Sequence, residues 1–152
     1  MPDQTTDDAV VIERHVAAPI DQVWAMWTDP THFASWYGPA GATIGTARID
    51  ARPGGDRVVA MTVQAPNGER TIWFTGTHVD VEAPTLLVYT EAMTDRDGGE
   101  PQSPVTTVRL DLTDDAGTTR LRLTHQGIPA DSPGATGWQM ALDKLDFVLR
   151  TD

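Results

Sequence analysis

The chain has 152 residues, a length that suits one domain with a core built without covalent cross-links. It contains no cysteine, which excludes disulfides, thiolate catalysis and cysteine-ligated zinc. The 22 acidic and 11 basic residues give a net charge of −11, and a field of this sign repels nucleic acid and anionic lipid surfaces.

The N-terminal residues 1–8 are polar and acidic, without the basic start or the apolar stretch of a signal peptide. No apolar run approaches the roughly 18 residues that a membrane-spanning helix needs. We therefore expect a flexible tail over residues 1–8, a single domain over residues 9–152, a cytoplasmic location and no membrane partner.

Two short helices are predicted after a first strand at residues 10–16. The apolar residues of the first helix are spaced by three or four positions, at Ile20, Val23, Trp24 and Trp27. The second helix begins at Asp29-Pro30, an N-cap followed by a first-turn proline, and ends before Gly38-Pro39.

From residue 43 onward the pattern changes to strands separated by turns. The predicted strands are 43–51, 57–64, 71–81, 86–93, 105–112 and 118–125. Their connections are short and rich in Gly, Pro and Asp, and Asn67-Gly68 is a strong hairpin signal. Short connections indicate antiparallel pairing, so we expect a seven-stranded antiparallel sheet.

The last predicted element is an amphipathic helix that follows Asp131-Ser132-Pro133. Its apolar stripe consists of Trp138, Ala141, Leu142, Leu145, Val148 and Leu149. This stripe must be buried, and the sheet is the only large surface available. The expected fold is therefore α+β, a helix-grip fold in which a curved sheet surrounds the long C-terminal helix and leaves a cavity between them.

Four segments in order resemble the START-like superfamily, also called the SRPBCC or Bet-v-type fold. They are an Ala-Pro, Val-Trp and Trp pattern in residues 18–39, an Arg-x-Gly-Gly turn in 51–61, a strand–proline–strand corner in 79–91, and the helix 137–149. Within the superfamily the chain resembles the branch of activators of the heat-shock chaperone ATPase. The resemblance covers residues 10–149. It implies the helix-grip fold and, as functions, ligand carriage, cyclase chemistry, or stress-related chaperone regulation.

Four residues are candidates for chemistry in the cavity. His125 shares a strand face with Leu121 and Leu123; if the leucines point inward, it is either a polar anchor and proton acceptor or a buried histidine satisfied by its surroundings. Tyr89 and Glu91 share one face of their strand, which is either the inner or the outer face. An inward carboxylate would have a raised pKa and suit acid–base chemistry, although glutamates are more often exposed. The strand face of His78 is equally open.

We expect a ligand to contact Trp36, Met61, Trp73, Tyr89, His125 and Met140. Trp36 is expected at the cavity mouth with one edge in solvent. Met61 and Met140 are expected to form adaptable parts of the cavity wall. No histidine cluster or nucleotide-binding motif occurs, so we expect no metal and no cofactor. The charged set Arg109, Asp111, Arg120 and Arg122 is predicted to form a cross-strand ladder on the outer face.

The sequence is compatible with three functions. The favoured one is binding of a small hydrophobic or aromatic molecule in the internal cavity, because no catalytic constellation is evident. The second is an enzyme of the cyclase, dehydratase or hydrolase kind that uses His125 with Glu91 or Tyr89. The third is a chaperone-regulating interaction module, and the sequence leaves both a chaperone partner and a homodimer open.

Overall fold

The computed structural model describes residues 8–96 and 99–151. Residues 1–7 of the expected tail lie outside the described residues. At the last position of the expected tail, the carbonyl oxygen of Asp8 accepts a hydrogen bond of 2.9 Å from the backbone N–H of Gly127.

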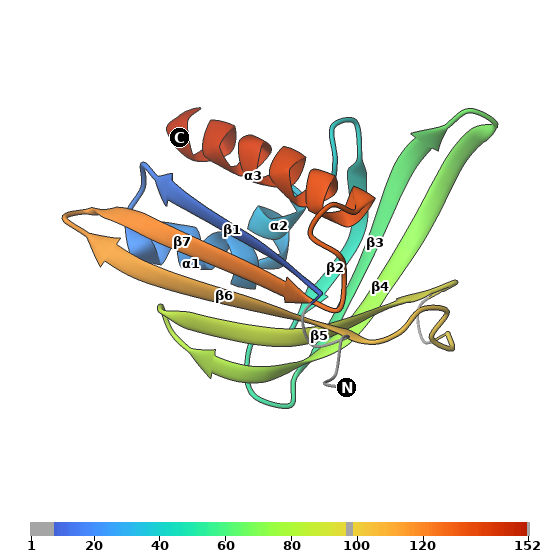
Figure 1. Ribbon diagram of the computed structural model, residues 1–152, viewed down its shortest axis with the longest axis horizontal. Helices are drawn as coiled ribbons and strands as arrows, with labels where there is room; N and C mark the ends of the chain where they lie inside the picture. Colours follow the sequence, from blue (N-terminus) through green and yellow to red (C-terminus); the bar gives the residue numbers. More distant parts are fainter. Residues whose placement is uncertain (1–7, 97–98, 152) are drawn as a thin grey trace.

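Across the described residues, seven strands form one antiparallel sheet in the order β1-β7-β6-β5-β4-β3-β2 (Figure 1). The strands are β1 (Ala9–Val16), β2 (Thr43–Ile49), β3 (Asp56–Ala65), β4 (Gly68–Glu82), β5 (Leu86–Thr94), β6 (Thr106–Asp115) and β7 (Thr118–Gln126). After β1 the chain crosses to the opposite edge and returns strand by strand until β7 pairs with β1. The predicted seven-stranded helix-grip fold is confirmed.

The helices lie on the concave side of this sheet. They are α1 (Ile20–Thr28), α2 (Pro30–Ala34) and the long α3 (Pro133–Thr151). Asp29 caps α2 as predicted, because its side chain accepts hydrogen bonds from the backbone N–H groups of Thr31 and His32. The sheet curves around α3 (Figure 1).

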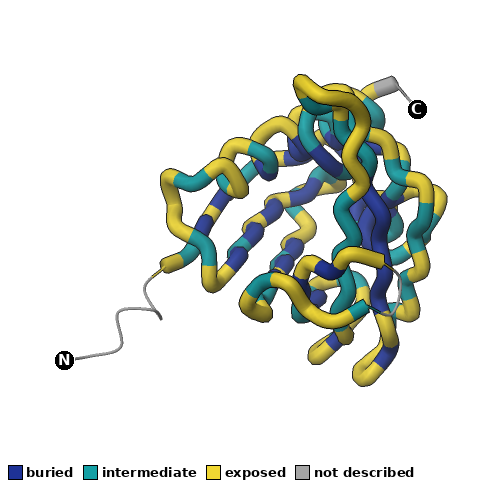
Figure 2. Tube along the Cα trace, turned by 90° about the vertical axis from the view of Figure 1, so that its right-hand side faces the viewer, coloured by how far each residue is buried: buried dark blue, intermediate teal, exposed yellow. Residues whose placement is uncertain are grey.

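The core fills the space between the helices and the concave face. Buried positions alternate with more exposed ones along β1, β6 and β7 (Figure 2), as expected for a sheet with one solvated face, whereas β3 and β5 are buried at consecutive positions. The stripe of α3 is buried as predicted at Trp138, Ala141, Leu142, Leu145 and Leu149. In α1, Met26 is buried beside Val23 and Trp27, whereas Trp24 is half-buried.

Burial shows which residues of β7 and β5 point toward the concave side of the sheet. Leu121, Leu123 and His125 are all buried, so His125 does point inward. Tyr89 and Glu91 are also buried and belong to the concave face of β5. His78 is buried as well, where its Nδ1 lies 3.1 Å from the carbonyl oxygen of Gly55.

Candidate functional site

A cavity of about 310 Å³ lies between the first turns of α3 and the concave face of the sheet. Its volume is at the small end of the range for ligand pockets. The lining comes from the segment after α2, from β3, β4, β5 and β7, and from α3: Tyr37, Gly38, Pro39, Met61, Phe74, Glu91, His125, Ile128, Pro133, Gly134, Gly137, Trp138 and Ala141. Most of these side chains are apolar, and Glu91 is the charged one among them.

Aromatic rings form one wall of this cavity. Tyr37 stacks on Phe33 with the ring centroids 4.6 Å apart. It also meets the edges of Trp138 at 5.6 Å and Phe74 at 6.3 Å. Such edge-to-face and stacked contacts hold rings in fixed positions, so the wall is preorganised.

Lys144 of α3 also links the segment after α2 to that helix. The Lys144 ammonium donates hydrogen bonds to the carbonyl oxygens of Tyr37 at 3.2 Å and Pro39 at 3.3 Å. Between them Gly38 has a φ of 93°, and a Cβ there would lie 2.8 Å from the sulfur of Met61. The backbone conformation therefore favours glycine at this position, and a side chain there would also displace the Met61 side chain.

His125 is held at the cavity wall by two hydrogen bonds. The indole N–H of Trp138 donates to its Nδ1 at 3.0 Å. Its Nε2 lies 2.8 Å from Thr106 Oγ1, and the Thr106 hydroxyl donates onward to the carbonyl oxygen of Glu91 at 3.2 Å. Because an indole nitrogen is only a donor, Nδ1 must be the acceptor, and the network assigns the proton of the neutral ring to Nε2.

This network keeps His125 uncharged. A second ring proton would place an N–H of His125 against the N–H of Trp138. Burial, and after it the positive charge of Arg57, lowers the pKa of His125 from its ordinary value of 6.5 to about 4. Both nitrogens are engaged, so the alternative of a buried histidine satisfied by its surroundings describes the structure better than a free proton acceptor.

In an NMR pH titration the His125 ring is expected to stay neutral through the neutral range and to titrate with a midpoint near 4. Since this pKa lies below the ordinary 6.5, protonation favours the unfolded chain, and stability falls as the pH drops from 6.5 toward 4. The variant Trp138→Phe removes the opposing N–H and should raise the midpoint. A wild-type midpoint near 6.5 would contradict the assigned network.

A buried ion pair lies beneath the cavity. Arg57 on β3 is 2% exposed and Glu91 on β5 is 5% exposed, and Arg57 Nη1 is 3.5 Å from Glu91 Oε1. The guanidinium lies between two rings, with its carbon 4.0 Å from the centroid of Tyr89 and 4.8 Å from that of Phe33. These cation–π contacts fix Arg57 in place below the cavity.

The burial of this pair changes the acidity of its neighbours. Burial raises the pKa of Glu91 above its ordinary value of 4.5, and the charge of Arg57 opposes that rise. Burial, followed by the charge of Glu91, raises the pKa of the Tyr37 hydroxyl well above 10.0. The Tyr89 hydroxyl and Arg57 Nη2 are buried without a hydrogen-bond partner among the described residues.

The structure places only some of the predicted contact residues in the cavity lining. Met61 and His125 belong to it, and so does the catalytic candidate Glu91. Tyr89 lies deeper, against Arg57. The ligand contacts expected of these residues stay predictions.

Three other placements need correction. Trp36 does not lie at the mouth with a wet edge, because it is fully buried and its indole N–H donates to the carbonyl of Met26 at 2.9 Å. Met140 is 38% exposed and lies outside the lining. Trp73 also lies outside it, since its neighbour Phe74 on β4 faces the cavity and successive strand residues face opposite ways.

Sequence reasoning missed Arg57, Tyr37 and Trp138. A signal for Arg57 was present: it shares its strand face with Val59 and Met61, which are both buried. Trp138 was predicted only as part of the apolar stripe of the last helix, and Tyr37 falls within the second predicted helix. Their place in the lining depends on how α3 and the segment after α2 approach each other.

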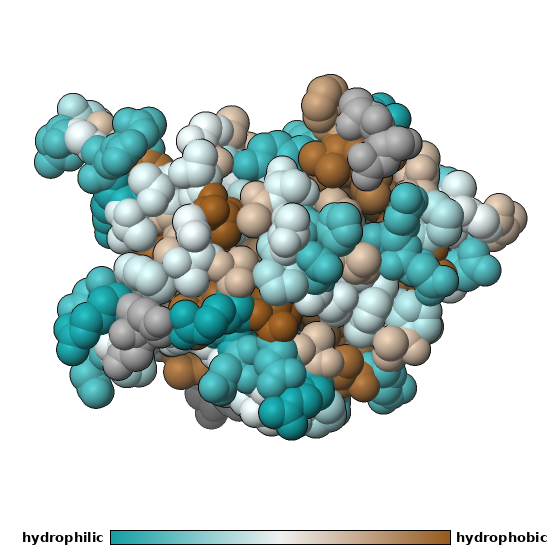
Figure 3. Space-filling model, turned by 180° about the vertical axis from the view of Figure 1, so that it is seen from behind, coloured by the Kyte–Doolittle hydropathy of each residue, from teal (hydrophilic) through white to brown (hydrophobic). Residues whose placement is uncertain are grey.

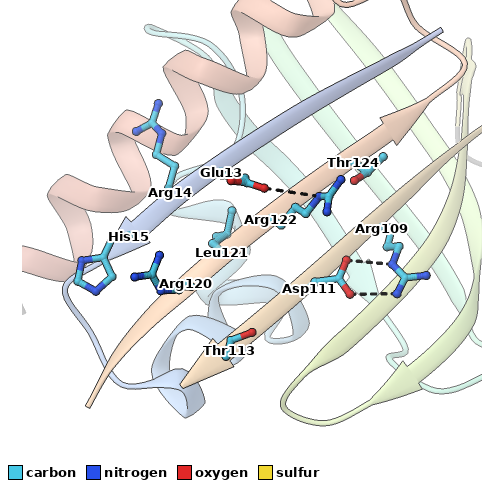
Figure 4. Close-up of a pocket in the computed structure, with 10 residues that line it drawn as sticks. All are labelled: Glu13, Arg14, His15, Arg109, Asp111, Thr113, Arg120, Leu121, Arg122 and Thr124. Atoms are coloured by element: carbon cyan, nitrogen blue, oxygen red, sulfur yellow. Dashed lines mark hydrogen bonds and ion pairs between the residues drawn. The ribbon is translucent and has the colours of Figure 1, made fainter. Parts of the chain in front are cut away.

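A larger hollow of about 690 Å³ lies on the outer face of β1, β7 and β6 (Figure 4). Its charges are paired, but not as the predicted cross-strand ladder: Arg109 pairs with Asp111 along β6 itself, and Arg120 and Arg122 pair with Asp115 and Glu13, which lie outside the predicted set. Arg109 lies 2.9 Å from Asp111, and Arg122 lies 3.9 Å from Glu13. The charges are thus paired along the solvated face, and the apolar cavity between α3 and the sheet remains the better candidate site.

Within residues 8–96 and 99–151, no helix combines the length and apolar character that crossing a bilayer requires. The same part of the chain shows no group of three His, Cys, Asp or Glu side chains arranged to hold a metal ion.

The seven-stranded sheet, the long helix that it surrounds and the cavity between them define a helix-grip domain of the START-like class. The chain belongs to the family described as Activator of Hsp90 ATPase homolog 1-like protein, whose family model matches residues 17–150. The resemblance seen in the four sequence segments is thereby confirmed. No curated protein matches the chain.

Several solved structures share this fold. A protein from Rhodobacter sphaeroides is similar with a TM-score of 0.79 and 28% identity, over 100% of this chain and 97% of the other. An AHSA1-like protein from Aeromonas hydrophila is similar with a TM-score of 0.72 and 28% identity, over 94% of this chain and 92% of the other. A Mycobacterium smegmatis protein, at 23% identity and a TM-score of 0.79 over 95% and 91% of the two chains, supports the fold alone.

Proposed function

We propose that this protein binds a small, largely apolar or aromatic molecule in the cavity between α3 and the sheet. The carrying observation is a preformed space of about 310 Å³ with mainly apolar walls and one buried carboxylate. Convergence of a few polar groups in an apolar pocket is typical of ligand sites. Membership in a fold class whose members commonly bind hydrophobic ligands supports the proposal.

The two alternatives receive less support. An enzyme that uses His125 as a base needs a free ring nitrogen, and Trp138 and Thr106 occupy both. A protein-docking module is favoured by a continuous apolar surface. The exposed large apolar residues belong to several elements, among them Val11, Val79, Met93 and Phe147, and the face in Figure 3 shows separate apolar spots among hydrophilic atoms.

The test is calorimetric titration with naphthalene, a rigid apolar probe of suitable size. Wild type is expected to bind one molecule, and Gly137→Leu to bind at least about tenfold more weakly. Gly137 lines the cavity, and a Cβ there would meet no atom within 4 Å, so a leucine has room to occupy the space. Because glycine costs a helix about 1 kcal/mol relative to alanine, this variant should not lose stability.

Met140→Leu serves as the control, since it changes an exposed residue of the same helix. It should bind naphthalene as wild type does. Equal binding by Gly137→Leu and wild type would place the bound molecule elsewhere, and no binding by wild type would reject the proposal.

A further inference from the structure

We infer that the buried Arg57–Glu91 pair makes the cavity selective for neutral ligands that carry a hydroxyl group, which donates a hydrogen bond to Glu91. This inference rests on the proposed function and names the chemistry of its ligand. It is carried by the charge balance beneath the cavity, by the spare acceptor capacity of Glu91 and by the engagement of both ring nitrogens of His125.

The first step concerns hydrogen-bond capacity. A carboxylate has two oxygens and room for about four donors. Among the described residues, the Glu91 carboxylate has one partner, Arg57 Nη1 at the long distance of 3.5 Å. Glu91 belongs to the cavity lining, so a donor on a bound molecule can reach its remaining acceptor positions.

The second step concerns the competing polar groups of the lining. His125 donates to Thr106 and accepts from Trp138, so its nitrogens are already satisfied. Lys144, which lies outside the lining, donates to the carbonyls of Tyr37 and Pro39. Near Glu91, Arg57 Nη2 is a buried donor without a partner among the described residues. A ligand therefore gains most from a hydroxyl, which can donate to Glu91 and also accept, and less from a group that only accepts.

The third step concerns charge. Arg57 cannot leave its place between the rings of Tyr89 and Phe33, so its positive charge stays close to the carboxylate. The pair is neutral in sum. An anionic ligand would meet Glu91 and a cationic one would meet Arg57, each in a medium that screens poorly. Either would bury a charge without a free counter-charge, which is costly.

The experiment compares four ligands of one ring size: naphthalene, 2-naphthol, 2-methoxynaphthalene and 2-naphthoate. Calorimetry on wild type is expected to show 2-naphthol binding about tenfold or more tightly than naphthalene, because a hydrogen bond to a charged group contributes roughly 1.5–3 kcal/mol. The methoxy compound, which only accepts hydrogen bonds, should gain nothing comparable. The carboxylate should bind more weakly than naphthalene.

The double variant Arg57→Met with Glu91→Leu removes both charges and keeps apolar bulk beneath the cavity. It should bind naphthalene and 2-naphthol with nearly equal affinity. Glu91→Gln, which is almost isosteric, should reduce the preference for 2-naphthol.

The outcomes separate the two proposals. If all four probes bind wild type equally well, or if 2-naphthoate binds best, the hydroxyl inference is overturned and the proposed cavity function stands. If none of them binds, both fail. A preference for 2-naphthol that persists in the double variant would also overturn the role of Glu91.

Discussion

Replacing Leu145 with alanine is expected to lower the free energy of unfolding by about 2–5 kcal/mol. Leu145 is 1% exposed and lies in the middle of the α3 stripe that packs against the core. Truncation removes apolar contacts and leaves a void that a close-packed core cannot fully close. Denaturant unfolding monitored by circular dichroism measures the loss.

Met140→Ala is the matched control for Leu145→Ala. Both changes shorten a large apolar residue of α3. Because Met140 is exposed, Met140→Ala should lower the free energy of unfolding by less than about 1 kcal/mol. If the two variants were equally stable, α3 would not pack on the sheet through the face that the structure shows.

Replacing Arg57 with methionine is expected to cost about 3–5 kcal/mol, the largest effect of a single change that we anticipate. The variant leaves Glu91 buried without its counter-charge. It also removes the cation from between the rings of Tyr89 and Phe33. Chemical unfolding at neutral pH measures this cost.

The stability of Arg57→Met should depend on pH in a defined direction. Burial already raises the pKa of Glu91 above 4.5, and loss of the opposing charge of Arg57 raises it further. A carboxyl whose pKa is raised on folding favours the folded state most below its ordinary pKa, and this advantage disappears as the pH rises through the raised value. The free energy of unfolding that Arg57→Met loses relative to wild type is therefore smallest in acid and grows toward neutral pH.

A second substitution in the same background distinguishes a lost charge pair from lost packing. Adding Glu91→Leu to Arg57→Met removes the unpaired charge, so the double variant should recover at least about 2 kcal/mol. If the double variant were as unstable as the single one, packing of the guanidinium between the rings would explain the whole effect.

The fold was predictable because each element carries a strong local signal. The stripe from Trp138 to Leu149 follows a helical period, and Asn67-Gly68 marks the β3–β4 hairpin. Short connections then leave antiparallel pairing as the simple solution. The exception in α1, where Met26 is buried and Trp24 only partly, arises because contacts with neighbouring elements select the buried face of a nine-residue helix.

The site was less predictable because its contacts join residues that are distant in sequence. The sequence does not distinguish a buried Trp36 from a tryptophan at the cavity mouth. In the structure the Trp36 indole N–H donates to a carbonyl of α1, and this partner is not evident from the sequence. Arg57 resembles an ordinary exposed strand arginine until Glu91, 34 positions away, and two rings are placed around it. The partners of His125 likewise depend on strand register and on the placement of α3.

The attachment of the cavity wall by Lys144 has a practical consequence for chemical labelling. Lys144 is the one lysine in the sequence, so apart from the α-amino group it is the single primary amine that an acylating reagent meets. Partial burial lowers its pKa, which increases the fraction of reactive neutral amine. A dye or isotope-tagged acyl group would therefore attach beside the cavity without any engineered cysteine, and it would release the carbonyls of Tyr37 and Pro39 in the same step.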